Sequence, residues 1–177
     1  MEIKQVQLPQ NSLAKSSFDT IDYFDAYQCK FTTKQNITVD DFIRAFFTST
    51  PKWVKYLFNF RNKIGKIFGL KTPLDKQDKK NVKRILSYEA GQKVGLFNIY
   101  ERTHNEVLLG EDDKHLDFRA SLLLARFPSG NCRFTISTTV KFHNWQGRLY
   151  FLPIKPFHKL VVKAMIKSTV LQVLKPE

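Results

Sequence analysis

Two neighbouring segments, residues 115–126 and 132–143, alternate apolar and polar side chains over their whole length. A period of two residues places successive side chains on opposite faces of a strand. One face of each strand is then apolar, made of Leu116, Phe118, Ala120, Leu122 and Leu124 in the first and of Cys132, Phe134, Ile136, Thr138, Val140 and Phe142 in the second. The opposite faces are polar. The pattern predicts an antiparallel sheet that a core covers on one side only.

A Pro-Ser-Gly-Asn turn at residues 128–131 joins the two strands. A loop this short fixes the pairing register, because a slip by one residue would turn every side chain to the wrong face. The register predicts Arg126 opposite Cys132, and Asp117 opposite Lys141. We expect the latter two to form an ordinary charge pair across the strands.

The same register places His115 beside His143, next to the acidic run Glu-Asp-Asp-Lys-His-Leu-Asp at residues 111–117. These histidines are the weak candidates for a metal site, but no regular metal-binding motif accompanies them, and a turn explains the acidic run. The chain has neither a Gly-x-Ser-x-Gly nucleophile elbow nor a Gly-rich dinucleotide motif. We therefore expect no cofactor, and we assign no catalytic residue.

The C-terminal segment predicts a long helix. Asn144 caps a lead-in over residues 145–151, Pro153 interrupts the chain, and Pro156 suits the first position of the helix. Its core face follows the helical spacing i, i+3, i+4 and consists of Phe157, Leu160, Val161, Ala164 and Ser168. A ridge of basic side chains on the opposite side consists of Lys155, Lys159, Lys163 and Lys167.

Further apolar residues lie near this lysine ridge and away from the assigned core face, namely Val162, Ile166, Val170 and Val173. Apolar and basic side chains together suit an anionic membrane surface. The alternative is that these residues contact a second sheet edge, the N-terminal arm or a dimer mate.

In chain order, the patterns predict an extended or partly disordered arm over residues 1–20 and a single domain over residues 21–177. The expected elements of the domain are a strand at 22–31, a helix capped by Thr38 and Asp41, a helix from Pro51 to Gly69, a basic loop at 71–93, a hairpin of 96–102 with 106–111, the two long strands and the C-terminal helix. This order predicts an α+β fold in which an antiparallel sheet wraps around the C-terminal helix, the helix-grip architecture.

Basic residues outnumber acidic ones, 29 against 16, which gives a net charge of +13. Such a surface attracts lipid headgroups, nucleic acid or an anionic ligand, or is simply solvated. No RNA-binding aromatic motif, zinc finger or recognition helix is present, so nucleic acid is the partner we expect least. Without a hydrophobic leader or a membrane-length apolar run, we expect a cytoplasmic protein, with attachment to a membrane surface as the alternative. Its oligomeric state is left open.

Several stretches carry a family resemblance, namely Asp22-Tyr23-Phe24-Asp25-Ala26, Pro51-Lys52-Trp53-Val54, residues 61–70, residues 110–119, Phe142-His143-Asn144, Gly147-Arg148-Leu149-Tyr150-Phe151 and Pro156-Phe157-His158. In these stretches the chain resembles an uncharacterised bacterial family, domain of unknown function 2867. That family in turn resembles the START-like, or SRPBCC, superfamily, whose members hold hydrophobic ligands between sheet and helix. The resemblance implies the same fold and no known reaction.

We therefore expect a binding module that holds a hydrophobic, amphipathic or anionic small molecule in a cavity between the sheet and the C-terminal helix. The expected lining residues are Arg61, Tyr100, Phe118, Phe142 and Phe157. Arg61 falls within an apolar helix stripe, where it either pairs with a carboxylate or binds an anionic group of the ligand. The alternatives are an enzyme of the same fold and a basic protein that docks on a membrane or a partner.

Overall fold

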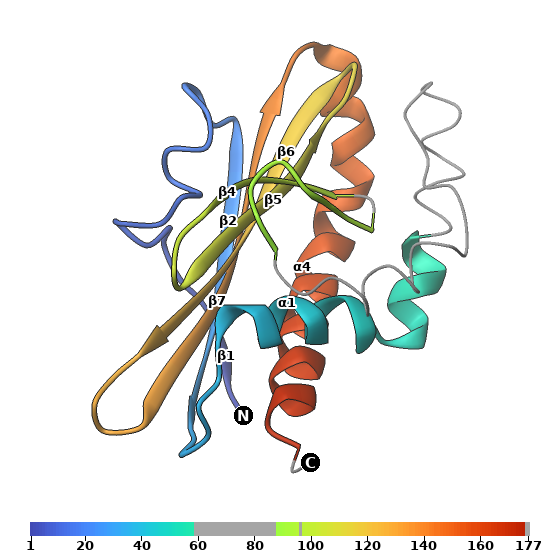
Figure 1. Cartoon of the computed structure of the whole chain (residues 1–177). Coiled ribbons are helices and arrows are strands. Elements are labelled where there is room, and N and C mark those ends of the chain that lie inside the picture. The colour runs from blue at the N-terminus through green and yellow to red at the C-terminus, as the bar shows by residue number, and fades with distance from the viewer. Residues whose placement is uncertain (59–87, 96, 176–177) are drawn as a thin grey trace.

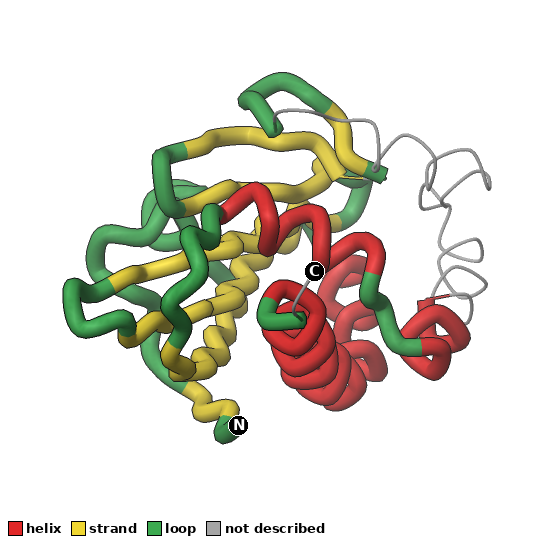
Figure 2. The backbone as a smooth tube through the Cα atoms, turned by 60° about the horizontal axis from the view of Figure 1, so that its bottom comes forward, coloured by secondary structure: helices red, strands yellow, loops and turns green. Residues whose placement is uncertain are grey.

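The computed structural model describes residues 1–58, 88–95 and 97–175. Within these ranges, seven strands form one antiparallel sheet in the order β1-β2-β7-β6-β5-β4-β3 (Figure 1). The strands are β1 (Ile3–Gln5), β2 (Tyr23–Thr32), β3 (Lys93–Val94), β4 (Phe97–Arg102), β5 (Glu106–Asp112), β6 (Leu116–Arg126) and β7 (Asn131–Phe142). The helices α1 (Val39–Thr48) and α4 (Trp145–Val173) lie together on one face of the sheet (Figure 2). Residues 52–58 form a further helical segment.

This arrangement confirms the predicted α+β fold, with helices after the first long strand and a long C-terminal helix. The sequence also predicted that the second helix ends at Gly69 and that residues 71–93 form a basic loop. Residues 59–87, which contain most of these features, lie outside the described residues.

The central pair β6 and β7 has the register that the short turn predicted, with Arg126 opposite Cys132 and Asp117 opposite Lys141. The predicted direct charge pair does not form, because each partner is engaged elsewhere. Lys141 Nζ lies 2.6 Å from Asp19 Oδ1, and Asp117 Oδ1 lies 2.9 Å from His143 Nε2. The alternating pattern fixes the register, whereas the terminal atoms of long polar side chains can reach several neighbouring partners.

Local signals for the other elements are also confirmed. Thr38 and Asp41 form a reciprocal capping box at the start of α1, which satisfies donors that the first helical turn leaves free. The predicted hairpin is the β4–β5 pair, and its tight turn is closed by a 2.8 Å hydrogen bond from Thr103 N to Glu106 O.

The N-terminal segment covers the face of the sheet opposite the helices. Ser12 Oγ donates to Glu106 Oε1 at 2.5 Å, Ser121 Oγ bonds the same oxygen, and Leu13 N donates to Oε2 at 3.1 Å. Burying a carboxylate is costly unless donors surround it. The buried Glu106 therefore fastens the segment after β1 to the polar face of the sheet.

The helix α4 is continuous from Trp145 to Val173, with both Pro153 and Pro156 inside it. The prediction that the helix begins at Pro156 was therefore wrong. The Asn144 cap is confirmed, because its side chain accepts from Gly147 N at 3.1 Å. Within the described ranges, no helix is long and apolar enough to cross a membrane.

The core face assigned to α4 was also wrong. Phe157 and Leu160 are 49% and 57% exposed. The residues of α4 that pack into the core are instead Val162, Met165, Ile166, Thr169 and Val170. The sequence had placed Val162, Ile166 and Val170 away from the core, against a membrane or else a second sheet edge, the N-terminal arm or a dimer mate. The structure buries them in the main core with residues of α1 and the sheet.

The lysines explain this error. Lys155 Nζ lies 5.1 Å from the ring centre of Tyr23, and Lys163 Nζ lies 5.3 Å from that of Tyr27. Both side chains thus lie along the sheet at β2, with their aliphatic stems against apolar surface. Because the lysines border the buried face, their position does not mark the opposite side of the helix. Apolar residues at helical spacing occur on two sides of α4, so periodicity alone could not select one.

The corrected face predicts how the two sides respond to truncation. Ile166→Ala should lower the free energy of unfolding by about 2–5 kcal/mol, because it leaves a cavity in the main core. The matched variant Leu160→Ala should change it by less than about 0.5 kcal/mol, because that side chain is exposed. Urea titration followed by circular dichroism measures both. If Leu160→Ala lost more unfolding free energy than Ile166→Ala, the core face first assigned from the sequence would be the right one.

Candidate functional site

A buried polar cluster lies between the sheet and α4. Asp25 on β2 is only 2% exposed. The Tyr23 hydroxyl donates to Asp25 Oδ2 at 2.6 Å, and Nε2 of His158, on α4, lies 3.5 Å from Asp25 Oδ1. The same Nε2 lies 3.1 Å from Thr138 Oγ1 on β7. We call these four residues, from three elements, the Asp25 cluster.

The sheet register builds this cluster. Tyr23, Asp25 and Tyr27 alternate along β2 and therefore share the face that the helices cover. Asp25 pairs directly with Thr138 of β7, so the carboxylate and the hydroxyl lie side by side. The helix α4 then brings His158 over this pair, because Asn144 begins the helix immediately after β7.

The start of α4 is held tightly against the end of the sheet. A Cβ atom at Gly147 would lie only 2.2 Å from the backbone oxygen of His115, so only glycine permits this approach. Asn144 Nδ2 lies 3.1 Å from His115 Nδ1 in the same corner. Close packing of the first helical turn fixes the path along which the rest of α4 crosses β7.

Burial alone raises the pKa of Asp25, but hydrogen bonds and charge from His158, with bonds from Tyr23 and Thr138, outweigh it and hold the pKa below its usual value. Burial, followed by the bond to Asp25, raises the pKa of Tyr23, so its hydroxyl stays protonated and donates. The cluster is thus an ionised carboxylate among donors. The His158 contact at 3.5 Å is longer than a good hydrogen bond, so Asp25 Oδ1 retains capacity to accept from a further donor.

Aromatic rings surround the cluster on the helix side. The Phe151 ring centre lies 4.8 Å from that of Tyr23, 5.5 Å from that of Phe142 and 6.5 Å from that of His158. Phe142 and Phe151 are both half-buried. They form an apolar wall beside the carboxylate.

A second series of rings crosses from α1 to the central strand β6. The rings of Phe46, Phe47, Phe97 and Phe118 follow one another at 5.2, 5.9 and 5.7 Å. Ala120 lies two residues beyond Phe118 on the same face, and it pairs with Thr138, the neighbour of Asp25. Phe97, Phe118 and Ala120 are half-buried. We use the name helix-facing patch for the four sheet residues Phe97, Phe118, Ala120 and Phe142 together with Phe151, which reaches them from α4.

The structure brings together only some of the predicted lining residues. Phe118 and Phe142 belong to the helix-facing patch. Tyr100 stacks 3.4 Å from the guanidinium of Arg119, on the opposite side of the sheet. Phe157 lies on the outer side of α4, and Arg61 lies outside the described residues.

The two histidines considered as metal ligands lie side by side, since His143 N donates to His115 O at 3.0 Å. Their side chains turn to different partners, His115 to Asn144 and His143 to Asp117. Among the residues that the structure describes, no group of three or more His, Cys, Asp or Glu could hold a metal ion.

A hollow of about 510 Å³ lies at the end of β2 and β7 that is remote from the Asp25 cluster. Its lining includes Phe31, Phe127 and Arg133, with Arg133 over the Phe127 ring at 4.5 Å. It does not include the Asp25 cluster. The cavity expected between the sheet and α4 stays a prediction.

The sequence profile of a family described as a protein of unknown function, DUF2867, matches residues 17–165. The chain belongs to the DUF2867 family. No curated protein matches it. A solved structure of an uncharacterised protein from Rhizobium leguminosarum is similar at 10% identity and a TM-score of 0.33, covering 87% of this chain and 98% of that chain. All four residues of the Asp25 cluster lie within the DUF2867 match.

Sequence reasoning missed the cluster in this DUF2867 chain, although a signal was present. In the predicted strand at 22–31, Asp25 has the same parity as the apolar residues Tyr23, Tyr27, Cys29 and Phe31. An acid in the middle of an apolar face is rare without a partner. Nothing in the local sequence of His158 indicated its contact with β2.

The pKa of Asp25 predicts how stability responds to acid. Because folding lowers this pKa below 3.8, the ionised carboxylate stabilises the fold above that value, and the contribution is lost as the pH falls through the lowered pKa. Asp25→Asn should cost about 1–3 kcal/mol at pH 7 and lose less stability than the parent below about pH 4. Urea titrations from pH 7 to pH 2.5 measure this, with exposed Glu2→Gln as control. If the parent and Asp25→Asn lost the same unfolding free energy as the pH fell, the assignment would be wrong.

Proposed function

We propose that the chain is a binding module for a hydrophobic or amphipathic small molecule, held against the helix-facing patch. The observation that carries the proposal is the position of the Asp25 cluster beside half-exposed aromatic rings. Small-molecule sites are mostly apolar, with a few polar groups that set orientation. The patch supplies the apolar surface, and the cluster supplies the polar groups. This is the START-like mode of binding that the sequence suggested.

The cluster also defines the polar end of the ligand. An ionised carboxylate repels another anion and accepts hydrogen bonds, so a hydroxyl or amino group fits beside it better than a carboxylate does. His158 is the more accessible partner, because its side chain is partly exposed while that of Asp25 is buried. An anionic group of the ligand would instead need a positively charged partner such as the guanidinium of Arg61. The preferred ligand is therefore a neutral or cationic amphiphile.

The distances suit a molecule of moderate size. Phe118 and Tyr23 lie in one row of the sheet with Val140 of β7 between them. Adjacent strands are about 4.8 Å apart, so the row spans roughly 10 Å from β6 to β2. An apolar body of that length would cover Phe118 and Ala120 while its polar end reached the cluster.

A second function has one observation in its favour. Asp25 and His158 form a carboxylate–imidazole pair, an arrangement that can orient a histidine as a general base. In an enzyme, incubation would change the mass of the bound molecule, and His158→Gln would stop that change without releasing the molecule. A binding module would return the molecule unchanged. Mass spectrometry of the extracted ligand separates the two.

The binding proposal predicts opposite results for two matched substitutions on β6. Ala120→Leu fills space on the helix-facing side, whereas Ala125→Leu adds the same volume on the other side. Native mass spectrometry of gently purified protein should show a bound small molecule in the parent and in Ala125→Leu. Occupancy in Ala120→Leu should fall at least about tenfold, the effect of a clash of about 1.4 kcal/mol.

Thermal melts should show both variants folded, because adding one side chain to a packed site costs about 1–3 kcal/mol. The proposal fails if the parent carries no bound molecule under any gentle purification. It also fails if both variants retain the molecule equally.

A further inference from the structure

The outer side of α4 exposes an unusual amount of apolar surface. Trp145 is 69% exposed and Leu152 is 71% exposed. The complete outer stripe consists of Trp145, Leu149, Leu152, Phe157 and Leu160, each more than two-fifths exposed. At about 100° per residue, these five positions fall within an arc of roughly 140°, so they lie on one side of the helix. A large exposed apolar patch with a polar rim marks an interaction site.

The charged residues of α4 itself are all basic, although Arg148 is paired with Asp22 at 2.7 Å. Over its 29 residues, α4 carries Arg148, Lys155, Lys159, Lys163 and Lys167 and has no acidic residue. Lys155 and Lys163 lie against the rings of Tyr23 and Tyr27 at the border of the buried face, so they flank the stripe. The helix therefore presents apolar side chains with a basic margin.

The charge decides which occupant fits. In a second copy of the chain, the outer stripe would bring two sets of like charges together on a protein whose net charge is already +13. A nucleic acid would pair with the lysines but would leave the apolar residues without a partner. An anionic lipid surface satisfies both, because headgroups attract the lysines and the acyl boundary accepts Trp, Leu and Phe side chains.

We propose that α4 docks on an anionic lipid surface, with the outer stripe in the headgroup region and the lysines against the headgroups. A helix of 29 residues is about 43 Å long at 1.5 Å per residue, so it can lie along the surface. The original membrane hypothesis used Val162, Ile166 and Val170 as the apolar component, but these residues are buried in the core. The exposed component is the outer stripe, of which Phe157 and Leu160 had been assigned to the core from the sequence.

Sedimentation with vesicles tests this directly. The parent should bind vesicles of phosphatidylcholine with phosphatidylglycerol at low salt, should bind pure phosphatidylcholine vesicles at least tenfold more weakly, and should dissociate as salt is added. Phe157→Glu should weaken binding about tenfold or more, through loss of apolar contact and added charge repulsion. Its matched control is Phe24→Glu, because Phe24 is a 46% exposed phenylalanine on the opposite face of the sheet. This control should bind like the parent.

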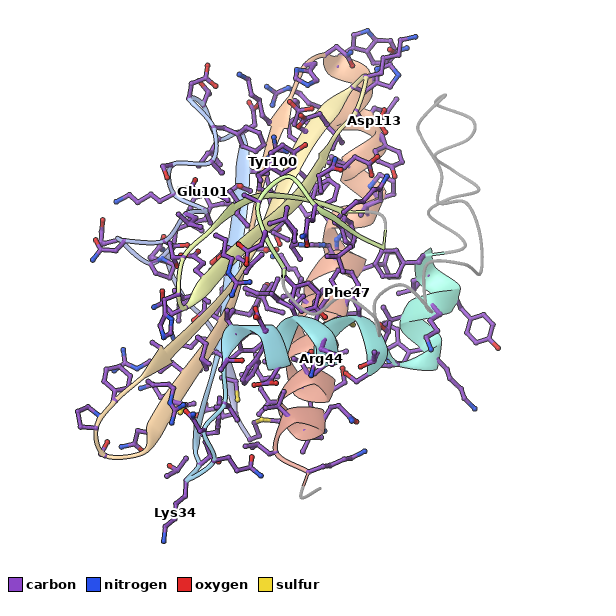
Figure 3. The ribbon with its side chains drawn as sticks, viewed as in Figure 1. Lys34, Arg44, Phe47, Tyr100, Glu101 and Asp113 are labelled. Atoms are coloured by element: carbon purple, nitrogen blue, oxygen red, sulfur yellow. The ribbon has the colours of Figure 1, made fainter. Side chains whose placement is uncertain are left out.

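A second pair of variants tests the position of the charges. Lys159→Glu/Lys167→Glu avoids the two lysines that stack on tyrosines and should weaken binding roughly thirtyfold or more. Lys30→Glu/Lys34→Glu makes the same change in net charge near the far end of the molecule, where Figure 3 shows Lys34. Its effect should be much smaller.

Three results would overturn the proposal. The first is no sedimentation of the parent with anionic vesicles at low salt. The second is equal binding by Phe157→Glu and Phe24→Glu, which would indicate charge attraction alone. The third is equal weakening by the two lysine double variants. Ala120→Leu should bind vesicles like the parent, so failure of the ligand-binding proposal would not affect this result.

Discussion

The pairing of β2 with β7 is the constraint on which the rest of the structure depends. It joins the first long strand to the last in continuous register, from Tyr23 opposite Val140 to Thr32 opposite Asn131. This ladder joins residues that are about a hundred positions apart in the sequence, and it places Asp25 beside Thr138. Because α4 begins directly after β7, the helix returns over the strand it has just left. His158 therefore reaches the carboxylate through chain connectivity as well as through packing.

Both faces of the sheet bury side chains, with different chemistry. The helix-facing side is mostly apolar, apart from the Asp25 cluster and the ion pair of Arg102 with Asp40 of α1. On the other side, Arg119 is buried between Phe18 and Tyr100 and pairs with Asp112 at 2.7 Å. Glu106 is likewise buried there among hydroxyl donors. Buried charges persist only when partners satisfy them, so the N-terminal segment that supplies some of these partners is part of the fold.

The sequence predicted those features that depend on neighbouring residues. The β6–β7 register followed from alternation and a short turn, and the start of α1 followed from Thr38 and Asp41. The features it missed depend on distant contacts. Periodicity could not choose the buried side of α4, since Leu160 and Ile166 both lie on apolar stripes. Periodicity also could not reveal the Asp25 cluster, because Asp25 and His158 are far apart in the chain. They come together only because β2 pairs with β7 and α4 then folds back over these strands.

The two halves of α4 are held by separate cores. Val162, Ile166 and Val170 belong to the main cluster, whereas Tyr150 belongs to a smaller one with Leu116 and Val140. Pro153 and Pro156 lie in the N-terminal half and remove backbone donors there, so that half has fewer backbone hydrogen bonds as well as a smaller core. Local stability follows such contacts. The outer stripe lies mostly on this weaker half, and its inner side covers the Asp25 cluster. A surface that binds the stripe therefore contacts the half of α4 whose inner side covers the proposed site.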